Sequence, residues 1–100
     1  MKVIWLDDAL NSYHQIIDYL AIKFDSKTAR KLDDKVSRVE VALCNFPDFG
    51  SIDPLFGNKD YRCVIILQNK LVYRVVEDTI YILAFWDCRR DSVAQAKKVK

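Results

Sequence analysis

The sequence predicts a small α+β domain with elements in the order β-α-α-β-β-β. Apolar residues recur every three or four positions through two long stretches before Pro47, the pattern of amphipathic helices. After residue 60, short apolar stretches follow one another with brief polar connections, which indicates an antiparallel meander. Glycine and proline are scarce, at two each, so most of the chain should lie in regular elements.

The first two elements are a short strand and a helix. Residues 2–6 form a short run that is apolar after Lys2 and reads as a short strand. Asp7 or Asp8 can then cap a helix that runs to about Phe24. The residues that share its apolar face are Leu10, Tyr13, Ile17, Leu20 and Phe24.

A second helix follows, capped at Asp25–Ser26 and ended by Pro47. Its apolar residues are Ala29, Leu32, Val36, Val39, Leu43 and Phe46. Because the connection is so short, the two helices should lie antiparallel and share an apolar seam, as an αα-hairpin. The opposite faces look solvated, with Lys27, Lys31, Asp34, Lys35 and Arg38.

Residues 47–60 form a loop that holds both prolines and both glycines. Phe49, Leu55 and Phe56 are expected to pin this loop to the core. The strands predicted after it are Tyr61–Leu67, Leu71–Val76 and Ile80–Phe85, joined by hairpin connections at Gln68–Lys70 and Glu77–Thr79. The tail over residues 93–100 reads as a frayed or weakly helical basic end.

Length and composition limit the class of protein. With 100 residues, of which 51% are hydrophobic, the chain should form one domain over residues 1–100. Three widely spaced cysteines and one histidine argue against a disulfide framework or a zinc site, and a reducing cytosol fits best. We expect no metal and no cofactor. The apolar run before Asp7 is too short for a signal peptide or a membrane span.

Charge is biased toward the C-terminal half. Residues 1–50 carry seven basic and eight acidic side chains, while residues 51–100 carry nine and six. The halves therefore contribute −1 and +3 to the net charge of +2. This bias is compatible with a basic face, but it is smaller than a dedicated duplex-DNA binder would show.

Arginines on and after the predicted sheet are the candidate binding residues. The strand Ile80–Phe85 leads into Arg89 and Arg90, which would place two guanidinium groups at the end of a rigid strand. A guanidinium matches the geometry of phosphate and carboxylate oxygens. Isolated surface arginines, however, are often simply solvated charges that contribute little to binding or stability. Alternation in the strand should separate Arg62 and Arg74 from the residues that face inward. That inward set is Tyr61, Cys63 and Ile65.

Other reactive or aromatic residues have plainer interpretations. Cys88, beside two arginines, could be a reactive thiolate with a depressed pKa, but no motif with a histidine supports a nucleophile there. His14 is expected to be a half-buried packing residue. Trp5 and Trp86 should pack on the core or the sheet, with stacking of Trp86 on a nucleobase as an alternative. Cys44 and Cys63 should be small core residues.

The order and spacing of these segments resemble the RelE/ParE family of bacterial type II toxins, also described as plasmid stabilisation toxins. The segments that carry the resemblance are Val3–Trp5, Ala9–Leu10, Ile16–Leu20, Asn45–Pro47, Leu71–Val75 and Ile80–Asp91. The resemblance covers nearly the whole chain. It implies a helical hairpin packed on an antiparallel sheet, a cytoplasmic location and a cognate antitoxin as partner.

The resemblance leaves two activities open. RelE-like toxins are ribosome-dependent mRNA endoribonucleases, and Arg62, Lys70 and Arg89 resemble their catalytic basic cluster. ParE-like toxins poison DNA gyrase by binding, for which Arg62, Arg74, Arg89 and Arg90 are the candidate contact residues. A family member that only binds its antitoxin is the third possibility.

Three departures favour the ParE-like interpretation. Val64 stands where a second lysine is often found, Lys70 replaces an arginine at the hairpin, and no tyrosine follows Arg90. RNA cleavage of this kind uses the 2′-hydroxyl as nucleophile and needs an acid for the leaving oxygen. We also expect an acidic antitoxin segment to bind across the αα-hairpin and the sheet, and Arg89 and Arg90 to carry the toxicity whichever target is right.

Overall fold

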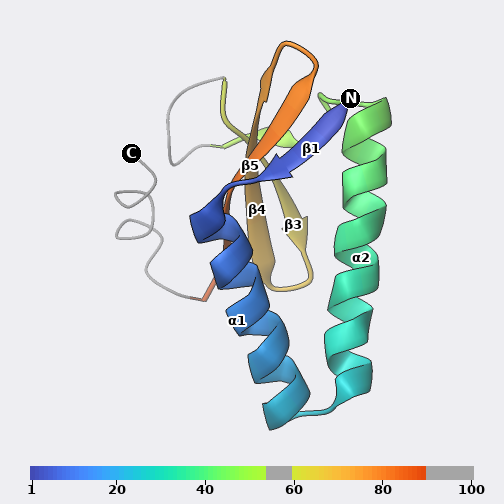
Figure 1. The fold of residues 1–100 in the computed structure, drawn as a ribbon, viewed down its shortest axis with the longest axis vertical. Coiled ribbons are helices and arrows are strands. Elements are labelled where there is room, and N and C mark those ends of the chain that lie inside the picture. The colour runs from blue at the N-terminus through green and yellow to red at the C-terminus, as the bar shows by residue number, and fades with distance from the viewer. Residues whose placement is uncertain (54–59, 90–100) are drawn as a thin grey trace.

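The computed structural model describes residues 1–53 and 60–89 (Figure 1). The elements are β1 (Lys2–Trp5), α1 (Asp7–Lys23), α2 (Ser26–Asn45), β2 (Ser51–Ile52), β3 (Arg62–Ile66), β4 (Asn69–Val76) and β5 (Thr79–Asp87). Leu55 and Phe56 of the predicted loop and the predicted tail over residues 93–100 lie outside the described residues.

The strands form one sheet in the order β1-β5-β4-β3-β2. β1 pairs with β5 in parallel, and the other neighbours pair antiparallel. The two helices run antiparallel to each other and cover one face of the sheet (Figure 1). This arrangement confirms the predicted α+β class with a helical hairpin on a sheet, and β2 is a short strand that the predicted order did not contain.

The two helices begin in different ways. The Asp25 carboxylate accepts a hydrogen bond from the backbone N–H of Thr28 at 2.7 Å, so Asp25 caps α2 as predicted. The prediction that Asp7 or Asp8 caps α1 is wrong, because Leu6 is the N-cap and no described side chain bonds there. Both aspartates lie in the first turn instead, where negative charge is stabilised by the helix dipole.

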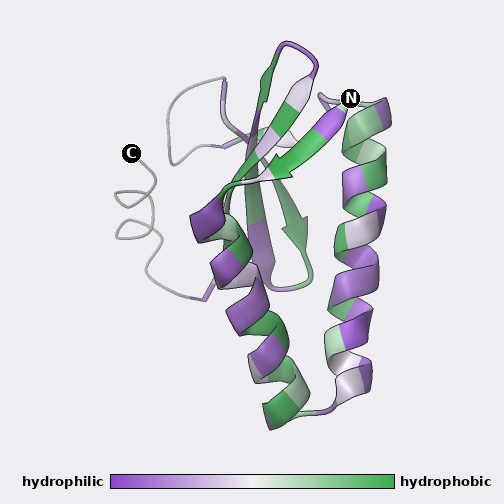
Figure 2. Cartoon of the chain, in the orientation of Figure 1, coloured by the Kyte–Doolittle hydropathy of each residue, from purple (hydrophilic) through white to green (hydrophobic). Residues whose placement is uncertain are grey.

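The apolar faces of the helices pack against the sheet, except at their ends. Figure 2 shows polar and apolar residues alternating along both helices, as amphipathic helices require. Phe24 and Phe46, predicted on the apolar faces, are 64% and 68% exposed because they lie just past the last helical turns. Within residues 1–53 and 60–89, no helix is both long and apolar enough to cross a membrane.

The sheet carries a hydrophobic cluster on each face. The main core lies between the helices and the sheet, and its buried residues include Tyr13, Leu32, Val36, Leu43, Leu71, Tyr73, Ile80, Ile82 and Phe85. A smaller cluster consists of Cys63, Val72, Ala84 and Trp86, with Tyr61 and Leu83 beside it. Because side chains alternate along a strand, this second cluster lies on the face opposite the helices, which we call the outer face.

In strand β3, the side chains that face the helices are the ones that were predicted to point away from the core. Val64 and Ile66 pack on the main core, whereas Cys63 belongs to the outer face and Ile65 is 59% exposed. The predicted inward set of Tyr61, Cys63 and Ile65 is therefore wrong for the main core. Both alternating sets of this strand are apolar, so the sequence pattern alone could not choose between them.

Both hairpins are tighter than predicted. Ile66 pairs with Asn69 and Val76 pairs with Thr79, so each connection has two residues and β4 already includes Asn69 and Lys70. The first turn residues, Leu67 and Glu77, have a φ of 57°. Glycine or asparagine usually marks such positions, and their absence explains why the turns were predicted as longer.

Candidate target-binding site

The predicted cationic residues occupy three separate places. Arg62 pairs opposite Tyr73 of the main core, so it lies on the helix-covered side of the sheet. Lys70 and Arg74 alternate with that set and lie on the outer face. Arg89 follows the end of β5. The sheet itself therefore separates Arg62 from Lys70 and Arg74.

Arg62 holds the loop that leads from α2 into the sheet. Its Nη1 donates to the carbonyl of Gly50 at 2.7 Å and to the carbonyl of Asp48 at 3.4 Å. Its Nε lies 3.8 Å from Asp48 Oδ1. The hydroxyl of the buried Tyr73 donates to the Pro47 carbonyl at 2.7 Å and accepts from Gly50 N–H at 2.9 Å. The main contacts of Arg62 are thus within its own chain.

Lys70 forms an ion pair with a fully buried carboxylate. Its Nζ lies 3.0 Å from Asp53 Oδ1, and the exposed fractions of the two side chains are 12% and 0%. Such a pair is costly to break, because removing one partner leaves the other charge in a poorly solvated place. Lys70 therefore ties β4 to the segment after β2.

Arg74 is exposed on the outer face. Its guanidinium carbon lies 5.9 Å from the centre of the Tyr61 ring, an arrangement that orients the cation without neutralising it. Among the residues that the structure describes, no ion pair joins Arg74 to a carboxylate. Arg74 is consequently an oriented cation that can accept an external partner.

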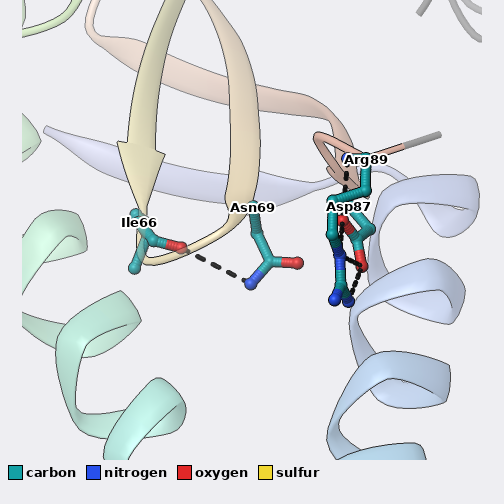
Figure 3. A network of polar contacts seen from close by, with 4 residues as sticks. All are labelled: Ile66, Asn69, Asp87 and Arg89. Carbon is teal, nitrogen blue, oxygen red and sulfur yellow. Dashed lines mark hydrogen bonds and ion pairs between the residues drawn. The ribbon is translucent and has the colours of Figure 1, made fainter. Parts of the chain in front are cut away.

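Arg89 is fixed by Asp87, the last residue of β5 (Figure 3). Its Nε lies 3.0 and 3.1 Å from the two Asp87 oxygens, and its backbone N–H donates to Oδ1 at 2.9 Å. These bonds raise the pKa of Arg89. The side chain remains 68% exposed. Asn69, opposite Asp87 in the sheet, donates instead to the Ile66 carbonyl. Arg90 lies outside the described residues.

The cysteines and His14 offer little nucleophilic chemistry. Partial burial raises the pKa of Cys88, with Lys70 acting in the opposite direction, so the depressed pKa considered from the sequence is wrong. Cys63 is buried and Cys44 is half-buried. His14 is exposed rather than half-buried, and its ring lies 6.0 Å from that of Tyr13.

The sequence analysis missed two carboxylates that form ion pairs with the candidate cations. Asp87 precedes Arg89 by two residues, so their pairing could have been suspected from spacing alone. Asp53 is 17 residues from Lys70 in a predicted loop, and nothing in the pattern indicates that it is buried. Arg62, Lys70 and Arg89 are all bonded to groups of their own chain, but Arg89 keeps 68% of its side chain exposed, and Arg74 is exposed as well. That arrangement suits binding of an anionic surface better than proton transfer.

Comparisons with known proteins find similarity to toxin–antitoxin systems of the ParDE type, both in sequence and in structure. The model of a family described as the ParE toxin of a type II toxin–antitoxin system, parDE, matches residues 3–92. Among solved structures, a chain of the chromosomal ParDE toxin–antitoxin system from P. aeruginosa has a similar fold, with a TM-score of 0.70. The two sequences are 18% identical, and the match covers 87% of this chain and 95% of that one. A comparison with curated proteins found no match.

Proposed function

Because this chain belongs to the ParE family of toxins of type II toxin–antitoxin systems, we propose that it arrests growth by binding and poisoning DNA gyrase. The family match extends over nearly the whole chain, from residue 3 to residue 92. A toxin of this kind is paired with an antitoxin, which is its partner in the cell. A gyrase target would place its action in the cytoplasm.

The observation that favours binding over RNA cleavage is the separation of Arg62, Lys70 and Arg89. A ribonuclease of this type needs its cations around one phosphate, where they orient the 2′-hydroxyl and stabilise the transition state. Arg62 instead bonds to loop carbonyls on the helix-covered side, while Lys70 pairs with buried Asp53. Bringing them to one phosphate would require breaking both sets of contacts.

Target contact is assigned to the exposed cations. Arg74 is oriented by Tyr61 and Arg89 by Asp87, so each would lose little conformational freedom on binding. Arg90, next in the chain, is proposed to act with Arg89. The predicted contact role of Arg62 becomes a supporting one, since Arg62 fixes the loop beside the sheet.

The cellular test is induced expression with pulse labelling of new protein. Gyrase poisoning should give filamentous cells and an induced DNA-damage response, while amino-acid incorporation continues through the first minutes. Co-expression of the product of the neighbouring gene should restore growth. Rapid loss of protein synthesis, with messages cut at the ribosomal A site, would contradict the proposal and support the ribonuclease alternative.

The antitoxin is proposed to lie across the αα-hairpin and the sheet. Exposed apolar residues on the hairpin and the loop after it give a partner segment places to anchor, namely Tyr19, Ile22, Phe24, Val41, Phe46 and Phe49. The test is co-purification from the native operon, followed by titration of the separated proteins. The absence of a complex at micromolar concentration would rule out this partner.

A further inference from the structure

A cavity of about 720 Å³ opens between the first turns of α1 and the outer face of the sheet. Asp7, Asp8 and Asn11 contribute to its wall from α1. Arg74 and Trp86 contribute from the sheet. A volume of this size is typical of ligand-binding sites.

The cavity forms because β1 is shorter than its neighbour. The β1–β5 pairing ends at Trp5 and Ile82, so the rest of β5 has no strand on that edge within the described residues. α1 takes the place of a strand there, and the Ser12 hydroxyl donates to the Phe85 carbonyl. Leu83 is an extra residue in the β4–β5 pairing, and such bulges commonly occur beside functional sites.

Trp86, one of the residues that line this cavity, carries a buried donor. Its side chain is 8% exposed, and its Nε1–H has no hydrogen-bond partner among residues 1–53 and 60–89. Buried donors without an acceptor are rare in native proteins, because they lose water and gain nothing in return. The other tryptophan has an acidic neighbour, since the indole of Trp5 lies close enough to the Glu40 carboxylate to lower the pKa of that group.

The charges around the cavity restrict what can fill it. Arg74 on the sheet favours an acidic group, whereas Asp7 and Asp8 at the start of α1 favour a basic one. A nucleic-acid backbone, negative throughout, would be repelled by the aspartates. A protein segment with side chains of both signs fits both walls, and the amides of Asn11 and Gln15 can bond to its peptide groups.

We infer that this cavity holds a segment of the antitoxin. An oxygen of that segment accepts a hydrogen bond from Trp86 Nε1–H, and one of its acidic side chains pairs with Arg74. The inference rests on the proposed toxin–antitoxin function and locates one part of the antitoxin surface on the toxin. It adds the edge of β5 and the outer face to the hairpin surface proposed above.

The test uses the indole N–H signals of the two tryptophans in ¹⁵N-labelled toxin, free and in complex with the antitoxin. Trp86→Phe and Trp5→Phe assign the two signals. On binding, the Trp86 signal should move downfield and its hydrogen exchange should slow by about tenfold or more. The Trp5 signal should change little, because Trp5 packs against the main core and does not line the cavity, and it serves as the internal control.

Affinity measurements give a second readout on folded variants. Arg74→Ala should weaken antitoxin binding about tenfold or more, the usual effect of losing a charge-assisted hydrogen bond. Lys31→Ala removes a positive charge from the solvated face of α2, more than two turns from the proposed anchor Val41, and should change affinity by less than about twofold. Both variants should melt like the parent protein.

Three outcomes would overturn the inference. One is an unchanged Trp86 signal in a complex that size-exclusion chromatography shows to be intact, which would leave the proposed function standing. Another is slow hydrogen exchange of the Trp86 indole N–H already in the free toxin, because that N–H would then have a hydrogen-bond partner without the antitoxin. The third is a shift of Trp86 with a DNA oligonucleotide in place of antitoxin. If no complex forms at all, the proposed partner fails together with this site.

Discussion

At the scale of single residues, the ion pair of Lys70 and Asp53 allows a test of whether Lys70 has a structural or a catalytic role. Lys70→Met removes the cation beside a fully buried carboxylate and should lower the free energy of unfolding by about 3 kcal/mol. Arg74→Met, at an exposed position on the same face, should change it by less than about 0.5 kcal/mol. Urea unfolding measures both. Equal, small losses would mean that Lys70 is available for chemistry.

Glu40 should make stability depend on pH. Burial raises the pKa of this half-buried carboxyl group above the ordinary 4.5, the nearby Trp5 side chain opposes that shift, and the charge of Asp33 adds to it. The folded state therefore keeps the proton to higher pH than the unfolded chain. The free energy of unfolding should fall as pH rises from about 4.5 through the folded pKa.

Glu40→Gln tests this sign. The glutamine stays neutral and has nearly the same shape as the glutamate, so the variant should be more stable than the parent protein near pH 7, with a smaller gain near pH 4. Asp25→Ala is the opposite control, because its hydrogen bond to Thr28 lowers the pKa of Asp25. Its loss of stability should shrink as pH falls. A Glu40→Gln gain that grows toward acid pH would show that the sign is wrong.

At the scale of elements, the two hairpin turns store conformational strain. Glu77 is exposed and has a φ of 57°, a conformation that costs a residue with a Cβ about 1 kcal/mol or more. Glu77→Gly should therefore raise the free energy of unfolding by up to about 1 kcal/mol. Asp78→Gly, next in the same turn and not at positive φ, should lower it. Thermal melts of the two variants should move in opposite directions.

The elements themselves could be predicted because their apolar periods are long and regular. The αα-hairpin has a cap at Asp25 and a short connection, so its existence and direction follow from local signals. β2 and the facing of β3 could not be predicted. β2 is two residues long and exists only through its pairing with Arg62 and Cys63, and β3 is apolar on both faces. These features depend on contacts between distant parts of the chain.

At the scale of the whole molecule, the sequence indicated which cations to consider but not which of them stay exposed. Arg89 and Arg74 could be expected on the surface, whereas the engagement of Arg62 and Lys70 depends on a loop whose path the pattern did not specify. The cavity at Trp86 was missed for a similar reason. It depends on the different lengths of β1 and β5, which appear only when the strands are paired.

Toxicity should depend on the cations at the end of β5. Alanine at both Arg89 and Arg90 should lower target affinity about ten- to a hundredfold and abolish growth arrest. The variant should still bind the antitoxin and melt near the parent temperature, because Arg89 is 68% exposed. Lys31→Ala with Arg38→Ala removes the same charge from α2 and should leave toxicity intact. A double Arg89 and Arg90 variant that still arrests growth at normal expression would exclude this role.

The most direct test of gyrase poisoning brings purified toxin together with DNA gyrase, ATP and plasmid DNA, and in parallel with a translating ribosome mixture. We predict that plasmid DNA trapped in cleaved complexes accumulates with toxin dose and disappears when antitoxin is added first. Messages in the translation mixture should stay intact at the same dose. Unaltered gyrase activity together with messages cut at the ribosomal A site would contradict the proposed function.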